Sequence, residues 1–166
     1  MKNCQKRTTY DKILEVVVIA VLLWAFCPLL FYNSIDSNAV FPTHYNIAGE
    51  VDGWGGRSFL WILPLIGLAL YIGLSIAQKY PRILNYPRQV TEQNADYLHK
   101  MGVQLIRHIK VIFVFILAYG CNDMYAGAMG KAFSHSGFVV ILSIAGMFLI
   151  ITIFCIKMIR YNPSKK

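Results

Sequence analysis

Charged residues are scarce in this chain. They form 14% of its 166 residues, whereas soluble domains average about a quarter. Hydrophobic residues reach 57%, and the mean hydropathy is +0.50. So few charges leave too much apolar surface for a soluble domain, and such hydrophobicity excludes a disordered chain. Four cysteines are too few for a disulfide-stapled secreted module. A small polytopic membrane protein remains.

Recognisable enzyme motifs are also missing. The chain has no P-loop, no dinucleotide glycine fingerprint, no HExxH pair and no GxSxG elbow. It lacks the interleaving of basic and aromatic residues that is typical of nucleic-acid binding. Its histidine and carboxylate spacing falls short of a zinc site. We therefore expect a non-enzymatic protein with no cofactor, no metal and no nucleic-acid partner.

Four apolar stretches favour membrane-spanning helices, because the bilayer core needs about 20 helical residues. They cover about 13–32, 59–78, 105–125 and 138–156. The predicted fold is an all-α bundle of four transmembrane helices that forms a single domain, 1–166. A Gly-rich outer loop, 33–58, joins the first two helices, and a cytoplasmic loop with a helix extension covers 79–104.

Two of these connections carry specific signals. Pro28 predicts a kink or an early end in the first helix. Thr91 is expected to be a helix N-cap. The helical spacing of Leu98, Met101 and Leu105 predicts one long helix that starts in the cytoplasm and continues into the third span.

Basic residues set the expected orientation. Fourteen of the sixteen lysines and arginines lie before the first span, between the second and third, or after the fourth. Only Arg57 and Lys131 lie on the other side. The positive-inside rule then predicts that both termini are cytoplasmic. The net charge of +8 is explained by contact with anionic lipids.

The outer loop is the most informative stretch. Its glycines permit tight turns with positive φ, and its aromatic residue can supply contact area. Two interpretations stay open: a folded cap that presents its polar side chains to a ligand, or a turn-rich loop in which Asp52 and Asn46 bond backbone amides. The candidate ligand-binding or loop-organising residues are His44, Asn46, Gly49, Asp52, Gly53 and Trp54.

The stretch Pro42-Thr43-His44-Tyr45-Asn46, followed by Gly49-Glu50-Val51-Asp52-Gly53-Trp54, carries a family resemblance. It resembles a bacterial membrane domain of unknown function that forms the N-terminal part of immunity proteins for the sporulation-delaying peptide toxin. Asn85-Tyr86-Pro87 is similar to the same family. The resemblance covers roughly 13–119. It implies a multi-pass protein of the bacterial plasma membrane and an immunity-like function. This chain departs from the full immunity proteins, since it lacks their further C-terminal membrane region.

Ionisable and polar residues near the spans form a second group of candidates. Asp123 follows Asn122 at the outer end of the third span, where it is either solvated or buried and paired with Arg57, Lys131 or His135. Glu15 is expected to form an ion pair with Arg107 or Lys110. A disulfide between Cys27 and Cys121 also stays open.

A stripe of small residues, Ala69, Gly73 and Ala77, follows one face of the second span. It serves either intramolecular packing or a homo-oligomer.

Three classes of function therefore stay open. The favoured one is an immunity-like or sensor-like protein that recognises a peptide or small ligand through its outer loop. The second is a small membrane enzyme or ion-coupled carrier that uses Asp123 with Asp52 and His44. The third is a ligand-free assembly subunit of a membrane complex.

Overall fold

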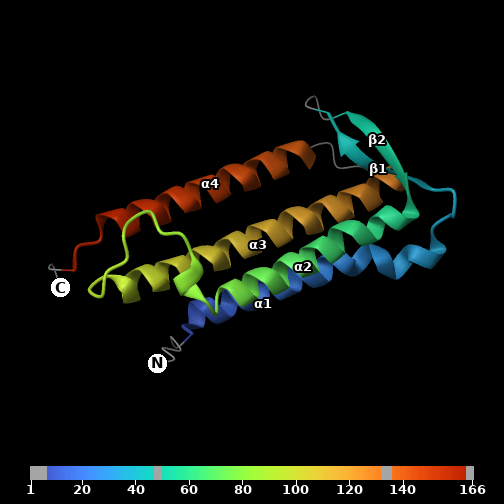
Figure 1. The fold of residues 1–166 in the computed structure, drawn as a ribbon. Helices are drawn as coiled ribbons and strands as arrows, with labels where there is room; N and C mark the ends of the chain where they lie inside the picture. Colours follow the sequence, from blue (N-terminus) through green and yellow to red (C-terminus); the bar gives the residue numbers. More distant parts are fainter. Residues whose placement is uncertain (1–6, 47–49, 132–135, 164–166) are drawn as a thin grey trace.

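The computed structural model describes residues 7–46, 50–131 and 136–163. Its architecture is mostly helical (Figure 1). The predicted four spans are confirmed to the extent that four helices are long and apolar enough to cross a membrane. Their bounds are α1 Thr9–Phe26, α2 Ile62–Ala77, α3 Ala95–Ala128 and α4 Ser136–Arg160.

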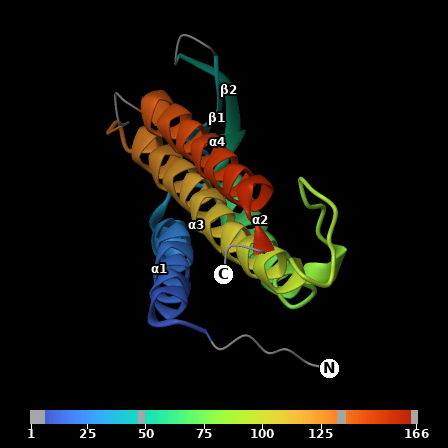
Figure 2. The same cartoon turned by 90° about the vertical axis from the view of Figure 1, so that its left-hand side faces the viewer.

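The central element is α3, which packs against each of the other three helices. Consecutive helices run in opposite directions, and α1 and α4 flank α3 on different sides (Figures 1 and 2). The first turn of α1 and the last turn of α4 lie at the same end of the bundle, which we call the terminal end. The opposite end, called the hairpin end, carries the only strands in the described part of the chain.

Helix α1 begins and ends where its sequence provides a signal. Thr8 and Asp11 form a capping box, in which each side chain accepts a hydrogen bond from the other residue's backbone N–H. The α-helix ends at Phe26, and a 3-10 segment, η1 (Cys27–Ser34), follows. Pro28 lacks the N–H that would continue the α-helix. The predicted early helix end at Pro28 is therefore confirmed.

The single long helix predicted before the third span is also confirmed. With 34 residues, α3 is about 51 Å long and exceeds a hydrocarbon core of about 30 Å. The prediction that Thr91 caps it is wrong, because the helix begins at Ala95 with Asn94 at the N-cap position. Asn94 is buried, and its side chain accepts from the Thr91 N–H and donates to the Gln89 carbonyl. It closes the turn before the helix.

The connection between α2 and α3 packs against the start of α3. It contains one short 3-10 turn, η3 (Pro81–Ile83). The Tyr86 hydroxyl donates to the Pro81 carbonyl at 2.7 Å. Burial raises the pKa of that phenol. A methyl group added at Gly102 would lie 2.9 Å from the Tyr86 side chain. The absence of a side chain at Gly102 therefore lets the loop lie directly on α3.

The outer segment corrects the all-α prediction. It contains an antiparallel two-stranded sheet, β1 (Val40–Tyr45) and β2 (Val51–Gly56). Pro42 stands opposite Trp54, and the register shifts beside His44. Proline and glycine disfavour strands, which is why the sequence pattern of this segment suggested turns. The hairpin forms despite them because its inner face packs on the end of the bundle.

A buried cluster joins the hairpin to the helices. Phe41 on β1 is fully buried, together with Leu60 from η2 (Arg57–Trp61) and with Cys121 and Met124 of α3. A second cluster deeper in the bundle joins Val18 and Leu22 of α1 to Val114 of α3. The hairpin therefore rests on the same helix that organises the rest of the bundle.

The hairpin has glycines at Gly53 and Gly55 because neighbouring atoms lie too close for a side chain, and not because the backbone needs a positive φ. Among described residues, the only positive φ belongs to Gly130, so the expected left-handed turns are not found at Gly53, Gly55 or Gly56. An added Cβ at Gly53 would lie 2.8 Å from the His44 Cβ. One at Gly55 would lie 2.6 Å from the Phe59 ring. These two glycines let β2 approach its neighbours.

This packing predicts different effects for two adjacent glycines. Gly55→Ala should lower the thermal unfolding midpoint in mild detergent, because the new methyl overlaps Phe59 and Thr43. Overpacking of this kind costs about 1–3 kcal/mol. Gly56→Ala is the matched control, since nothing lies within 4 Å of its added Cβ. Equal midpoints for the two variants would contradict the packing.

Candidate functional site

The hairpin brings two of the predicted site residues together. The His44 Nδ1 lies 2.5 Å from an Asp52 carboxylate oxygen across the two strands. Both side chains are exposed, His44 by 71% and Asp52 by 44%. Trp54 lies two residues further along β2 and is 61% exposed. This part of the hairpin therefore presents a hydrogen-bonded histidine and carboxylate and a large aromatic surface to the outside.

Asn46 organises the hairpin near its tip. Its side-chain oxygen accepts from the Glu50 N–H at 2.9 Å, and its amide donates to the Glu50 carboxylate at 3.0 Å. Its backbone N–H also donates to the Glu50 carbonyl. Asn46 thus bonds a backbone amide, as the turn-rich interpretation expected, whereas Asp52 bonds the His44 side chain. Gly49 lies outside the described residues.

Within residues 7–46, 50–131 and 136–163, no group of three or more His, Cys, Asp or Glu is placed to hold a metal ion. The His44–Asp52 couple can exchange its internal bond for bonds to a polar ligand. An exposed tryptophan supplies apolar contact area with few rotatable bonds.

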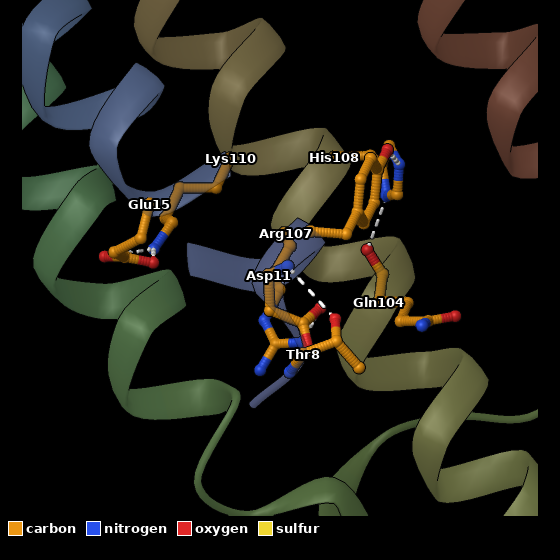
Figure 3. A network of polar contacts seen from close by, with 8 residues as sticks. Thr8, Asp11, Glu15, Gln104, Arg107, His108 and Lys110 are labelled. Atoms are coloured by element: carbon orange, nitrogen blue, oxygen red, sulfur yellow. Dashed lines mark hydrogen bonds and ion pairs between the residues drawn. The ribbon is translucent and has the colours of Figure 1, made fainter. Parts of the chain in front are cut away.

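A polar network inside the terminal half of the bundle joins α1, α2 and α3. Figure 3 shows its side chains from α1 and α3. Lys110 is 1% exposed, and its Nζ lies 2.9 and 3.1 Å from the two Glu15 oxygens. The same ammonium donates to the Ser75 hydroxyl at 3.0 Å and lies 4.6 Å from the centre of the Tyr71 ring. The Tyr71 hydroxyl donates to Glu15 at 2.8 Å. Glu15 therefore pairs with Lys110, one of its two expected partners.

A second layer of the network lies closer to the terminal end. Arg107 forms an ion pair with Asp11, and both side chains are largely buried. The His108 ring bonds the Gln104 carbonyl through Nδ1 and the Tyr10 hydroxyl through Nε2. These contacts bind the first turns of α1 to α3 (Figure 3).

Sequence reasoning did not predict Asp11, Tyr71 or Ser75 as members of this network. It named Arg107 only as a partner of Glu15, whereas Arg107 pairs with Asp11. Their spacing contained a signal. Asp11 and Glu15 are four residues apart, and Arg107 and Lys110 are three apart, so each pair shares one helix face. Two acids and two bases, each pair separated by about one helical turn, predict a two-layer contact between the helices.

The structure places the other predicted polar residues at the hairpin end of α3. Asp123 is 3% exposed, which excludes the solvated position. The Asn122 amide donates to the Trp24 carbonyl of α1 and to the Ala118 carbonyl of its own helix. Arg57 donates to the Ile35 carbonyl, and its guanidinium covers the Tyr32 ring. Asp123 is thus buried near the helix junctions, whereas His44 and Asp52 are exposed on the hairpin.

Two further expectations concern packing. Cys27 and Cys121 are free thiols, so the disulfide left open between them is not formed. Cys121 is buried with its sulfur near the Leu60 carbonyl. On α2, Ala69 and Gly73 are exposed, and nothing lies within 4 Å of a Cβ added at Gly73. Gly67 instead makes the close contact, next to Leu22 and Leu117.

Part of the chain is similar in sequence to known proteins. Residues 17–68, from α1 through the hairpin into α2, match a domain of unknown function, DUF1648. An uncharacterized protein of Archaeoglobus fulgidus is 33% identical over 82 residues. That match covers 45% of this chain and 43% of the relative, so the chain spans less than half of the relative's length. No solved structure matches.

The buried ion pair predicts strong coupling between Lys110 and Glu15. Lys110→Met should destabilise the protein by about 3–5 kcal/mol, because it leaves a partly buried carboxylate without its counter-charge. The double variant Lys110→Met/Glu15→Gln should recover much of that loss, since no charge is then left alone. Thermal unfolding in mild detergent measures both.

Lys100→Met is the control for this comparison, because Lys100 lies exposed on the same helix. Its unfolding midpoint should match that of the wild type. The single variant Glu15→Gln completes the comparison. A double variant whose loss equals the sum of the Lys110→Met and Glu15→Gln losses would show that the pair is not coupled.

Proposed function

We propose that this multi-pass membrane protein recognises a peptide or small ligand at its hairpin end and is not an enzyme. The observation that carries the proposal is the exposed Trp54, held on a hairpin whose other face is anchored by fully buried Phe41. Tryptophan is enriched among the residues that carry most of the binding energy at interfaces. His44 and Asp52 beside it supply polar contacts that orient a ligand.

In this proposal each residue has a distinct part. Trp54 supplies contact area. His44 and Asp52 exchange their mutual bond for bonds to the ligand, while Asn46 holds the hairpin tip closed through Glu50. Gly53 keeps the two strands close enough for this arrangement. Because α3 supports β1 from below, little ordering of the hairpin is needed on binding.

The finer part of the proposal is immunity to a secreted peptide in a bacterial plasma membrane. It rests on the resemblance of the stretch 42–54 to the immunity-protein domain alone, because the matching family over residues 17–68 is a domain of unknown function. The proposed orientation has both termini in the cytoplasm, because fourteen of sixteen basic residues lie toward that side. The hairpin then faces the medium, where a secreted peptide arrives.

A protection assay tests this proposal. The gene is deleted in its native host, and the cells are exposed to spent medium from sibling cultures. Wild type should restore growth. Trp54→Ala and Asp52→Ala should protect at least tenfold less well, because they remove the aromatic contact and the polar partner of His44.

Trp61→Ala is the matched control, because Trp61 is also exposed near the hairpin end but belongs to η2. It should protect as well as the wild type at equal protein level in the membrane. Full protection by all three variants would reject the hairpin as the recognition surface. Deletion cells that resist the medium without any complementation would reject immunity.

A second candidate function is an ion-coupled carrier. The burial of Asp123 within a membrane-spanning helix favours it, because ionisable groups at membrane depth are costly and commonly functional. In that case Asp123→Asn should abolish a proton flux across vesicles containing the purified protein. A wild-type flux no greater than that of empty vesicles would reject the carrier.

A further inference from the structure

An apolar groove of about 270 Å³ runs between α1 and α4, with α3 as its floor. It exists because α4 packs mainly on α3 and leaves space beside α1. Figure 2 shows α4 and α1 on different sides of α3. None of the residues in the most apolar 18-residue stretch of α4 is buried inside the protein. The lining residues are Val17, Val21, Val111, Ile112, Phe115, Ser143, Gly146 and Ile150.

The size of the groove decides which kind of occupant fits. Ser143 and Ile150 are seven residues apart, about 10.5 Å along a helix. Dividing the groove volume by the distance between Ser143 and Ile150 gives a mean cross-section of roughly 26 Å². A helix about 10 Å in diameter needs roughly 80 Å². A whole helix therefore cannot enter the groove, although side chains of a second copy of this chain can pack along its opening.

The chemistry of the lining excludes two other occupants. Ser143 is the only polar residue in it, and its hydroxyl already donates to the Val139 carbonyl at 2.8 Å. An extended peptide would leave its backbone N–H and C=O groups without partners there. A polar small molecule would lose its hydration without compensation. A single hydrocarbon chain meets both the width and the chemistry.

Two basic residues lie on the groove-lining face of α4, closer to the terminal end than the groove itself. Phe154, Lys157 and Arg160 continue the helical spacing of Gly146 and Ile150, so they share one face. Lys157 is about 10 Å from Ile150 and about 21 Å from Ser143 along the axis. Half of a hydrocarbon core is about 15 Å. A lipid phosphate beside Lys157 would therefore place the distal part of its chain in the groove.

We propose that the α1–α4 groove binds one acyl chain of an anionic phospholipid from the leaflet at the terminal end, with its phosphate at Lys157 and Arg160. The small volume of the groove suits a single chain, and the two cations favour an anionic headgroup. This site is separate from the hairpin, so it holds whether or not the proposed recognition function is correct.

Native mass spectrometry tests the site. The full chain is reconstituted in vesicles of equal phosphatidylglycerol and phosphatidylcholine and is then extracted in mild detergent. Wild type should retain one phospholipid, with phosphatidylglycerol favoured at least threefold. Gly146→Leu should lose it at least fivefold, because nothing lies within 4 Å of an added Cβ and the new side chain occupies the groove.

Gly137→Leu is the matched control, because its position on α4 is equally open and lies outside the groove. It should retain the lipid. Lys157→Gln/Arg160→Gln should keep a lipid but lose the preference for phosphatidylglycerol. If Gly146→Leu does not fold, Val21→Phe fills the groove from the α1 side.

Three results would overturn the site. One is a wild-type protein that carries no phospholipid. Another is groove-filling variants that retain the lipid as the wild type does. The third is a wild-type dimer that Gly146→Leu dissociates, which would assign the groove to a second copy of the chain.

Discussion

The Lys110 ammonium is the constraint on which this bundle depends. A charge that is 1% exposed among apolar helices must find a counter-charge and hydrogen-bond acceptors inside the protein. Glu15, Ser75 and the Tyr71 ring provide them, from two different helices. Satisfying one lysine therefore fixes both α1 and α2 against α3. The Asp11–Arg107 pair repeats the α1–α3 contact one turn closer to the terminal end.

The two ends of the bundle are built on different physics. At the terminal half, direction-specific ion pairs set how the helices align, since hydrophobic contact alone discriminates poorly between alignments in a lipid environment. At the hairpin end, the buried side chains of Phe41, Leu60 and Met124 hold a small sheet on the helices. That arrangement allows the outward face of the hairpin to be polar and aromatic without weakening its attachment.

The sequence was a good guide to the features that depend on composition and helical periodicity. Four apolar stretches, the proline after Phe26 and the continuous spacing through Leu98 and Leu105 predicted the helices and the unusual length of α3. The sequence also predicted an ion pair of Glu15 with Arg107 or Lys110, because a charge in an apolar span needs a partner, and Lys110 is the partner found.

The features that depend on contacts between distant segments could not be predicted in this way. The hairpin opposes local propensity, since Pro42 and the glycines of β2 disfavour strands, and it forms because Phe41 meets α3 residues about eighty positions away. The role of Gly53 and Gly55 depends on His44 and Phe59 lying above them, which no local pattern reveals. The burial of Asp123 likewise follows from helix junctions rather than from its neighbours in sequence.

The peripheral position of α4 reflects which helices the buried polar contacts join. The ion pair and hydrogen bonds of Lys110 join α1, α2 and α3, whereas α4 meets the terminal half through buried Met158 and through the contact of Phe154 with His108. There Arg88 donates to the Ile159 and Tyr161 carbonyls, and Tyr97 stacks on Tyr161. These contacts hold the C-terminal end of α4, whereas its middle turns pack on α3. Since α4 packs mainly on α3, an apolar groove separates its middle turns from α1.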